Sequence, residues 1–129
     1  MKVKLKVDYR EPNEIIEMLK KNDKIEVEVQ PLKIGDYVTD AVVIERKTVC
    51  DLVNSAYNKR LWEQMFAMGD IPKDRVFLII EFTGQWWRRL DEVGPITRGC
   101  ARWGYGIMIS TSTKQTVEHI ENLILEKRK

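Results

Sequence analysis

The sequence has few of the residues that build disulfide-linked or metal-binding small domains. It contains two cysteines, Cys50 and Cys100, and one histidine, His119, among 129 residues. The cysteines lack metal-ligand spacing, and a single histidine cannot build a multi-histidine metal site. We therefore expect two free thiols in a reducing compartment: the cytoplasm, or the nucleus if the source is a eukaryote.

Long apolar runs and a strong net charge are also absent. No apolar run approaches the roughly 20 residues that cross a bilayer. The first six residues alternate between apolar and basic types and lack the continuous apolar stretch of a signal peptide. The formal net charge is only +2, which is mild for a nucleic-acid-binding protein. We therefore expect no membrane partner, and any nucleic-acid binding must come from a local patch.

The length and composition predict one soluble domain over residues 1–129, with 43% hydrophobic and 33% charged residues. Hydrophobic periodicity predicts strands and helices in alternation. Strands are expected at residues 2–7, 25–30, 32–38, 41–47, 75–82 and 107–109. Helices are expected at residues 14–21 after an Asn13 cap, 48–68 after a Thr48 cap, 96–103, and from a Ser112 capping box to the basic end at 126–129. This order favours a mixed α/β sheet with helices on both sides.

The most informative stretch is Gly35–Asp51, where an apolar strand ends in charge. Side chains alternate along a strand, so Glu45 and Lys47 share one face and Arg46 points to the other. A hairpin through a turn at 39–40 would bring Asp36 back towards Glu45. The sequence therefore predicts two carboxylates and a lysine converging at one strand end.

Such a set suits metal-assisted hydrolysis of a phosphodiester. Asp36 and Glu45 would supply the hard oxygen ligands that Mg²⁺ or Mn²⁺ prefers. The ion would lower the pKa of the attacking water and neutralise phosphoryl charge, and Lys47 would steer that water. The alternative is a Glu–Lys ion pair on a solvated strand end.

The flanking residues resemble a known family. Gly35-Asp36, Glu45-Arg46-Lys47 and Asp51 are similar to the GD-Xn-ERK-X3-D motif of the ERCC4-type nucleases, which include XPF and archaeal Hef. Three further segments are similar to the opening, central strand and late part of that family. They are Val7–Glu11, Leu78–Glu81 and Arg98–Gly104. The resemblance runs in order over most of the chain.

The resemblance implies a restriction-endonuclease-like fold and metal-dependent cleavage of DNA, at branched, flap or fork structures. Asp8 would be a third ligand of the metal or would order the site. Arg46 and Arg10 would brace the site or hold phosphate, and Glu11 and Asp51 would support the residues that touch the metal. For Asp51, capping of the following helix is an equal alternative. Glu81 is interpreted as the exit of its strand rather than as a site carboxylate.

Two segments are candidate DNA contacts. Lys59 and Arg60 lie in the 48–68 helix, where the family carries a basic residue before a Leu-x-x-Gln stretch. Residues 83–95 form a long loop with a Trp86-Trp87-Arg88-Arg89 centre, a combination typical of base stacking and phosphate contact. A solvated helix face in the first case, and a segment closing over the core in the second, are the alternatives.

Three further expectations concern partners and rival functions. XPF and Hef relatives commonly continue into a helix-hairpin-helix domain, so this sequence, which stops at Lys129, is interpreted as an excised domain or a short protein that needs a partner. A homodimer or heterodimer is expected, with Ile120 of the last helix as its proposed seam. A non-catalytic DNA-binding or scaffold subunit, and a Holliday junction resolvase or restriction enzyme of the wider fold, stay open as alternatives.

Overall fold

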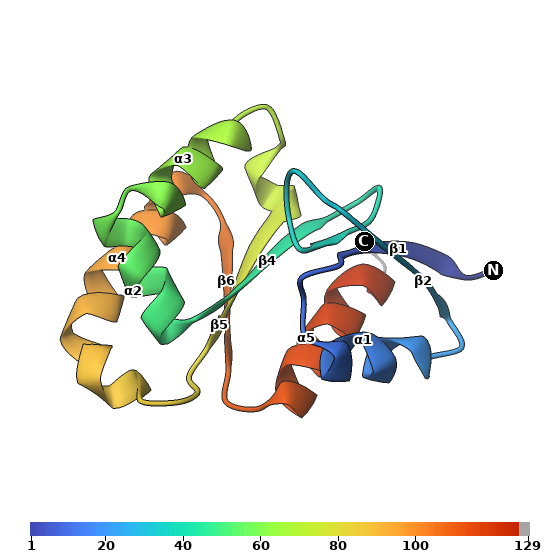
Figure 1. Cartoon of the computed structure of the whole chain (residues 1–129). Helices are drawn as coiled ribbons and strands as arrows, with labels where there is room; N and C mark the ends of the chain where they lie inside the picture. Colours follow the sequence, from blue (N-terminus) through green and yellow to red (C-terminus); the bar gives the residue numbers. More distant parts are fainter. Residues whose placement is uncertain (127–129) are drawn as a thin grey trace.

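In the computed structural model, which describes residues 1–126, a six-stranded sheet runs through the molecule between two groups of helices (Figure 1). The strands follow one another across the sheet in the order β2-β1-β3-β4-β5-β6. They are β1 (Val3–Asp8), β2 (Ile25–Gln30), β3 (Tyr37–Val38), β4 (Val43–Thr48), β5 (Val76–Glu81) and β6 (Gly106–Ser110). Strand β1 is parallel to β2 and antiparallel to β3, β3 is antiparallel to β4, and β4, β5 and β6 are mutually parallel neighbours. The predicted mixed α/β sheet is confirmed.

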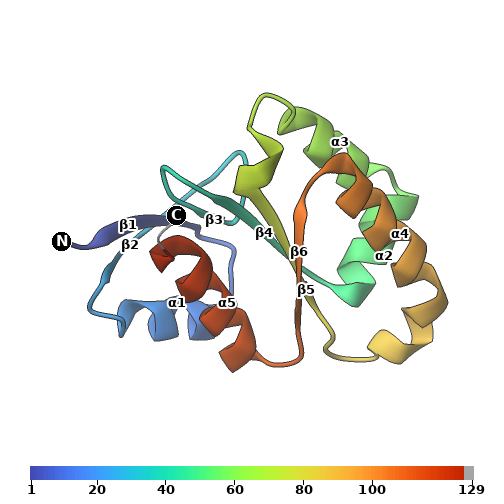
Figure 2. The same cartoon turned by 180° about the vertical axis from the view of Figure 1, so that it is seen from behind.

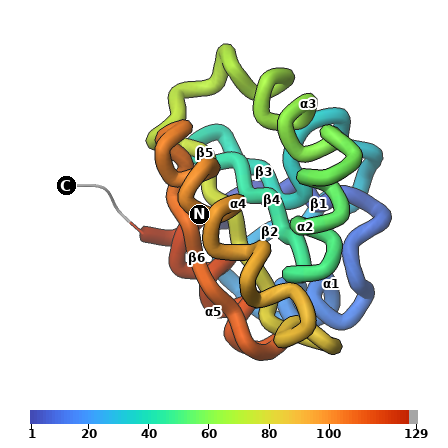
Figure 3. The backbone as a smooth tube through the Cα atoms, turned by 90° about the vertical axis from the view of Figure 1, so that its left-hand side faces the viewer, coloured from blue at the N-terminus to red at the C-terminus, as the bar shows by residue number. Residues whose placement is uncertain are grey.

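The helices cover the two faces of the sheet in separate groups. Helices α1 (Asn13–Lys20) and α5 (Thr113–Leu125) pack together over one face, and α2 (Val49–Tyr57), α3 (Arg60–Ala67) and α4 (Leu90–Trp103) lie over the other (Figure 2). Figure 3 shows the second group with its three helices in front of the strands. Two short 3-10 helices, η1 (Lys73–Arg75) and η2 (Trp86–Arg89), flank β5. The sheet therefore separates two apolar cores, one beneath each group of helices.

The predicted hairpin forms and places the 35–51 motif. Tyr37 pairs with Ile44 across an antiparallel β3–β4 ladder, and the Thr39 N–H donates to the Val42 carbonyl at the turn. Gly35 has a φ of +79°, and a Cβ there would lie 2.7 Å from Val43 Cγ1. Glycine is required at this position because both the backbone angle and the space exclude a side chain.

Three helix predictions are corrected by the structure. Asn13 is the first residue of α1, and the residue before it, Pro12, takes the cap position without a side-chain hydrogen bond. The predicted 48–68 helix divides into α2 and α3 because Lys59 adopts a left-handed φ of 69°. The predicted 96–103 helix begins at Leu90, so α4 carries Pro95 within it. Thr48 and Ser112 are confirmed as caps, since their hydroxyls accept from Asp51 N and Gln115 N.

The predicted dimer seam on α5 is wrong in its main residue. Ile120 is fully buried in the chain's own core with Val117, against α1. Val117 and Ile120 are used within this chain, while Leu123, Ile124 and Leu125 are half-buried. The predicted basic end at residues 127–129 lies outside the described residues. Within residues 1–126, no helix has the length and apolarity that crossing a membrane requires.

Candidate active site

The end of β4 sends charged side chains to both faces of the sheet, as alternation predicts. Val43 belongs to the core under α2, α3 and α4, and Ile44 belongs to the core under α1 and α5. Continuing this alternation, Glu45 and Lys47 face the α3 side, where they line a pocket with Leu61 of α3. Arg46 faces the opposite side.

Asp36 and Glu45 meet at this strand end. The Arg46 backbone N–H donates to Asp36 Oδ2 at 2.8 Å, and the Gly35 N–H donates to Glu45 Oε1 at 3.2 Å. Burial, reinforced by the negative charge of Glu45, raises the pKa of Asp36 to about 7. Burial also raises the pKa of Glu45, while the charge of Lys47 acts in the lowering direction on both groups. The hairpin therefore holds two carboxyl groups whose simultaneous ionisation is unfavourable.

A hard divalent cation fits this pair of carboxyl groups. Two carboxylates close together repel each other when both are ionised, and a bound cation would remove that cost. Mg²⁺ commonly takes one or two protein carboxylates and keeps water in its other positions. In residues 1–126, no group of three or more acidic, histidine or cysteine side chains is arranged to hold a metal. Asp36 and Glu45 are the two carboxyl groups that would hold such an ion.

Helix α3 forms the outer wall of the pocket beside these residues. Besides Glu45 and Lys47, the lining is mostly apolar and comes from α3, β5 and the end of α4. The other lining residues are Leu61, Gln64, Met65, Met68, Val76, Phe77, Leu78, Cys100 and Tyr105. Gln64, in the predicted Leu-x-x-Gln stretch, is the one uncharged polar side chain on α3 among them. Lys47, which forms no ion pair with residues 1–126, lines this pocket together with Glu45.

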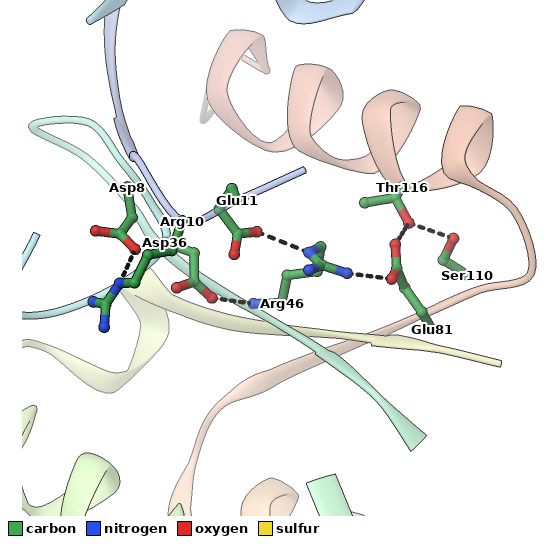
Figure 4. Close-up of polar contacts among 8 residues, drawn as sticks. All are labelled: Asp8, Arg10, Glu11, Asp36, Arg46, Glu81, Ser110 and Thr116. Atoms are coloured by element: carbon green, nitrogen blue, oxygen red, sulfur yellow. Dashed lines mark hydrogen bonds and ion pairs between the residues drawn. The ribbon is translucent and has the colours of Figure 1, made fainter. Parts of the chain in front are cut away.

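On the other face, the Arg46 guanidinium joins two acidic side chains (Figure 4). Arg46 Nε donates to Glu11 Oε1 at 2.8 Å, and Arg46 Nη1 donates to Glu81. Thr116 Oγ1 of α5 donates to Glu81 Oε2 at 2.6 Å and lies 2.7 Å from the Ser110 hydroxyl. The predicted bracing role of Arg46, and the supporting role of Glu11, fit these contacts. We call this set (Glu11, Arg46, Glu81, Ser110 and Thr116) the arginine network.

Glu81 was interpreted from the sequence as a strand exit rather than a site carboxylate, and it is the last residue of β5, on the face opposite Glu45. Its side chain is buried and bonded at both oxygens. In β5, Phe77 and Ile79 point to the α1–α5 face, so Glu81 follows them at the same period of two. The sequence contains that alternation, but not the β4–β5 register that brings Glu81 to Arg46.

Asp8 lies beside the hairpin and is already occupied by other partners. Arg10 Nε donates to Asp8 Oδ2 at 2.9 Å, and the Leu32 N–H donates to Asp8 Oδ1 at 3.0 Å. Burial would raise the pKa of Asp8, but the Leu32 and Arg10 hydrogen bonds outweigh it and hold the pKa below its usual value. The predicted third-ligand role is not supported by this geometry. The alternative, ordering of the site, fits because the Asp8 backbone N–H also donates to the Asp36 carbonyl.

The other predicted residues lie outside the pocket. Asp51 is exposed in the first turn of α2 and its backbone N–H bonds to Thr48, so capping rather than site bracing describes it. Lys59 and Arg60 are exposed at the corner between α2 and α3. Arg60 donates to Asn58 through its backbone N–H and its Nε.

The Trp86–Arg89 group divides between core and surface. Trp86 packs against the core, with its ring 5.3 Å from that of Phe82. Trp87 is exposed, as is Arg88. Arg89 donates to Glu92 and to Asn54 of α2. The interpretation of this segment as a closure over the core therefore holds for Trp86 and Arg89.

Comparison with known proteins gives consistent similarities. A family model described as the ERCC4 domain matches residues 7–123. The 3'-flap repair endonuclease Xpf of Saccharolobus solfataricus is 36% identical over 80 residues, which are 61% of this chain and 34% of that protein. A Methanocaldococcus jannaschii protein that carries the name of an ATP-dependent RNA helicase is 34% identical over 120 residues, 90% of this chain and 14% of that protein.

The solved structures agree. XPF from Aeropyrum pernix, in complex with DNA, superposes with a TM-score of 0.76 at 25% identity, covering 96% of this chain and 64% of that one. A second structure of XPF from Aeropyrum pernix gives a TM-score of 0.75 at 28% identity, covering 94% of this chain and 63% of that one. In each comparison, this chain spans less than two thirds of the relative's own length.

Proposed function

The chain belongs to the ERCC4 domain family, and from this membership we propose that it is a metal-dependent endonuclease domain that hydrolyses phosphodiester bonds in DNA. The preferred substrates would be branched, flap or fork structures, in keeping with the flap endonuclease among its relatives. The observation that carries the proposal is the half-buried Asp36–Glu45 carboxyl pair, which shares a strand end with Lys47.

In this proposal, Asp36 and Glu45 hold Mg²⁺ or Mn²⁺, which when bound would polarise a phosphoryl oxygen and promote loss of a proton from water. Lys47 orients the attacking water and offsets the charge that develops on the phosphoryl group. The arginine network holds β4 from the opposite face. The Asp36 carboxyl is held by the Arg46 backbone N–H, which donates to Asp36 Oδ2.

The direct test is cleavage of labelled flap, fork, four-way and blunt duplex DNA, each with Mg²⁺, Mn²⁺ or EDTA. We expect cleavage of branched DNA with either ion and none in EDTA. Glu45→Gln removes one ligand charge at nearly constant volume and should lower the cleavage rate by at least ~100-fold. DNA binding should persist, since a negative charge facing phosphate is lost.

Glu26→Gln is the matched control because Glu26 is an exposed carboxylate on β2, away from the Asp36–Glu45 pair. It should cleave like the unchanged protein. If the unchanged protein binds branched DNA but cleaves none of these substrates with either ion, the chain is a non-catalytic binding or scaffold subunit. Preferential cleavage of four-way junctions would instead favour the resolvase alternative.

We also propose a partner subunit, because the sheet has an exposed apolar edge strand. Strand β6 is the last strand of the sheet, and Ile109 on it is 52% exposed. An exposed apolar edge strand is a suitable place for a second chain to pair. Sedimentation equilibrium measures this directly: a mass near 15.2 kDa at all micromolar concentrations excludes a homodimer and leaves only a different partner.

A further inference from the structure

The corner between α2 and α3 exposes three aromatic side chains. Tyr57 is 70% exposed, Trp62 is 41% exposed and Phe66 is 81% exposed. Together with Lys59 they line one open groove, which Ala56 and Glu63 complete. We call Tyr57, Trp62 and Phe66 the aromatic corner. Large exposed rings gathered in one place on a small domain usually mark a binding surface.

This corner lies against the back of the candidate active site. Leu61, Gln64 and Met65 of α3 line the pocket that contains Glu45 and Lys47. Trp62 and Phe66, each one residue further along, point to the outer side of the same helix. A helix with its side chains is about 10 Å across. A chain that crosses the pocket can therefore reach the aromatic corner within a few nucleotides.

The backbone at the corner gives a second, independent indication. Lys59 has a φ of 69°, and it is the one non-glycine residue with a positive φ in residues 1–126. Glycine or asparagine adopts this conformation at lower cost than lysine. Strained positions of this kind cluster at functional sites. Lys59 stands directly after the C-cap of α2, and Arg60 places a second cation beside its ammonium group.

We propose that the aromatic corner binds the unpaired strand of a DNA substrate, with its rings stacking on bases and with Lys59 and Arg60 contacting phosphates. Stacking rings flanked by cations are the usual means of holding single-stranded nucleic acid without reading its sequence. Glu63 lies in the same groove and limits phosphate contact to the Lys59 side. The proposal rests on the proposed function, because it assumes that the chain acts on DNA.

Binding is measured with the full chain in EDTA, so that cleavage plays no part. The probes are fluorescent oligothymidine, a blunt duplex and a fork with one unpaired arm. Phe66→Ala should weaken binding of oligothymidine and of the fork roughly ten-fold, as expected for one lost stack, and leave the duplex nearly unchanged. Because Phe66 is highly exposed, this change should not unfold the chain.

Two replacements separate stacking from simple apolar contact. Phe66→Trp should keep the affinity for oligothymidine, while Phe66→Leu, which keeps apolar area without a ring, should lose it. Lys59→Gly should also weaken binding while its melting temperature stays the same or rises, because glycine relieves the left-handed backbone. Val29→Ala is the control, since Val29 is 45% exposed on β2, away from this corner.

Equal affinity of Phe66→Leu and the unchanged protein for oligothymidine would overturn the proposal. A second outcome would also overturn it. If the mass of the unchanged protein rises with concentration, and Phe66→Ala is a monomer with unchanged DNA affinity, then the corner binds a second copy of the chain rather than DNA. Cleavage assays keep the two proposals apart. Cleavage by the unchanged protein together with full binding by Phe66→Ala refutes only the aromatic corner; ring-dependent binding without cleavage refutes only the nuclease.

Discussion

The end of β4 carries charge on both faces of the sheet, and the two faces treat it differently. On the α1–α5 face, the Arg46 guanidinium is matched by Glu11 and Glu81, and Thr116 satisfies a further oxygen of Glu81. On the α3 side, burial raises the pKa of Asp36 and of Glu45, and the charge of Glu45 raises the pKa of Asp36 further, with Lys47 as the nearby cation. We call the α1–α5 face satisfied, because the charge of Arg46 has matched partners. We call the α3 side unsatisfied, because the two carboxyl groups there are costly to ionise together.

The contrast separates what holds the strand from what acts on a substrate. A buried charge with matched partners is costly to disturb but does not attract ligands. Two carboxyl groups that cannot ionise together without cost are ready to take a cation, because binding removes the repulsion between them. Strand alternation makes both arrangements possible within three residues.

The largest expected effect comes from breaking the satisfied face. Arg46→Met removes the guanidinium and leaves Glu11 and Glu81 without their shared cation, which should cost about 3–5 kcal/mol of unfolding free energy. Urea unfolding followed by circular dichroism measures it. The triple change Arg46→Met, Glu11→Gln and Glu81→Gln should recover much of the loss, because no unpaired charge remains. A single variant as stable as the unchanged protein would show that the network contributes little.

A second effect should come from the unsatisfied face and should depend on pH. The pKa of Asp36 is about 7 in the folded chain against an ordinary 3.8, so the folded state holds a proton that the unfolded state has lost. Stability without metal should therefore be fully present below about pH 4 and decrease as the pH rises to about 7. Because Asp36 and Glu45 share this cost, we expect the free energy of unfolding to decrease by about 2 kcal/mol over that pH range.

Asp36→Asn tests this pH dependence directly. In EDTA, it should be more stable than the unchanged protein at pH 8 and nearly equal to it at pH 4, as measured by urea unfolding. Mg²⁺ at pH 8 should stabilise the unchanged protein and not the variant. Asp51→Asn, which alters an exposed carboxyl, is the control. Its free energy of unfolding should depend on pH in the same way as that of the unchanged protein. If the free energy of unfolding in EDTA varies with pH equally in Asp36→Asn and the unchanged protein, ionisation of Asp36 does not destabilise the fold and the prediction is wrong.

The sequence predicted the unsatisfied face better than the satisfied one. Asp36, Glu45 and Lys47 lie within twelve consecutive residues of one hairpin, so strand alternation and a turn are enough to bring them together. The arginine network joins Glu11, Arg46, Glu81 and Thr116, which come from four separate parts of the chain. Their meeting depends on the parallel register of β4 with β5 and on the placement of α5. Local periodicity contains neither of these, and for that reason the sequence did not reveal the partners of Glu81.

The same reason explains the errors at the helices. The 48–68 segment keeps an apolar period across its whole length, so periodicity alone predicts one helix. The break depends on the backbone of Lys59, a residue with no propensity for the left-handed region. The start of α4 was missed because Pro95 normally marks the beginning of a helix rather than its sixth residue. In α5, the apolar stripe was correctly placed, but the packing of α1 against it depends on tertiary structure.

The smallest effect is expected at the far end of the arginine network, and it sharpens the comparison between the two faces. Thr116→Val keeps the shape of a buried side chain and removes the hydroxyl that donates to Glu81, which should cost about 1–2 kcal/mol in unfolding free energy. Thr116→Ser restores the hydroxyl and should recover part of that loss. Thr97→Val is the control, because the Thr97 hydroxyl only donates within α4 to the Val93 carbonyl.

Cleavage by Thr116→Val decides whether the two faces are independent. Asp36 is held by the backbone N–H of Arg46 rather than by its guanidinium, so a weaker bond at Glu81 should leave the Asp36 position nearly unchanged. We therefore expect the cleavage rate per folded molecule to stay close to that of the unchanged protein at a temperature well below unfolding. A large fall in that rate, with Mn²⁺ affinity by calorimetry falling in parallel and with recovery in Thr116→Ser, would show instead that α5 positions the carboxyl pair through Arg46.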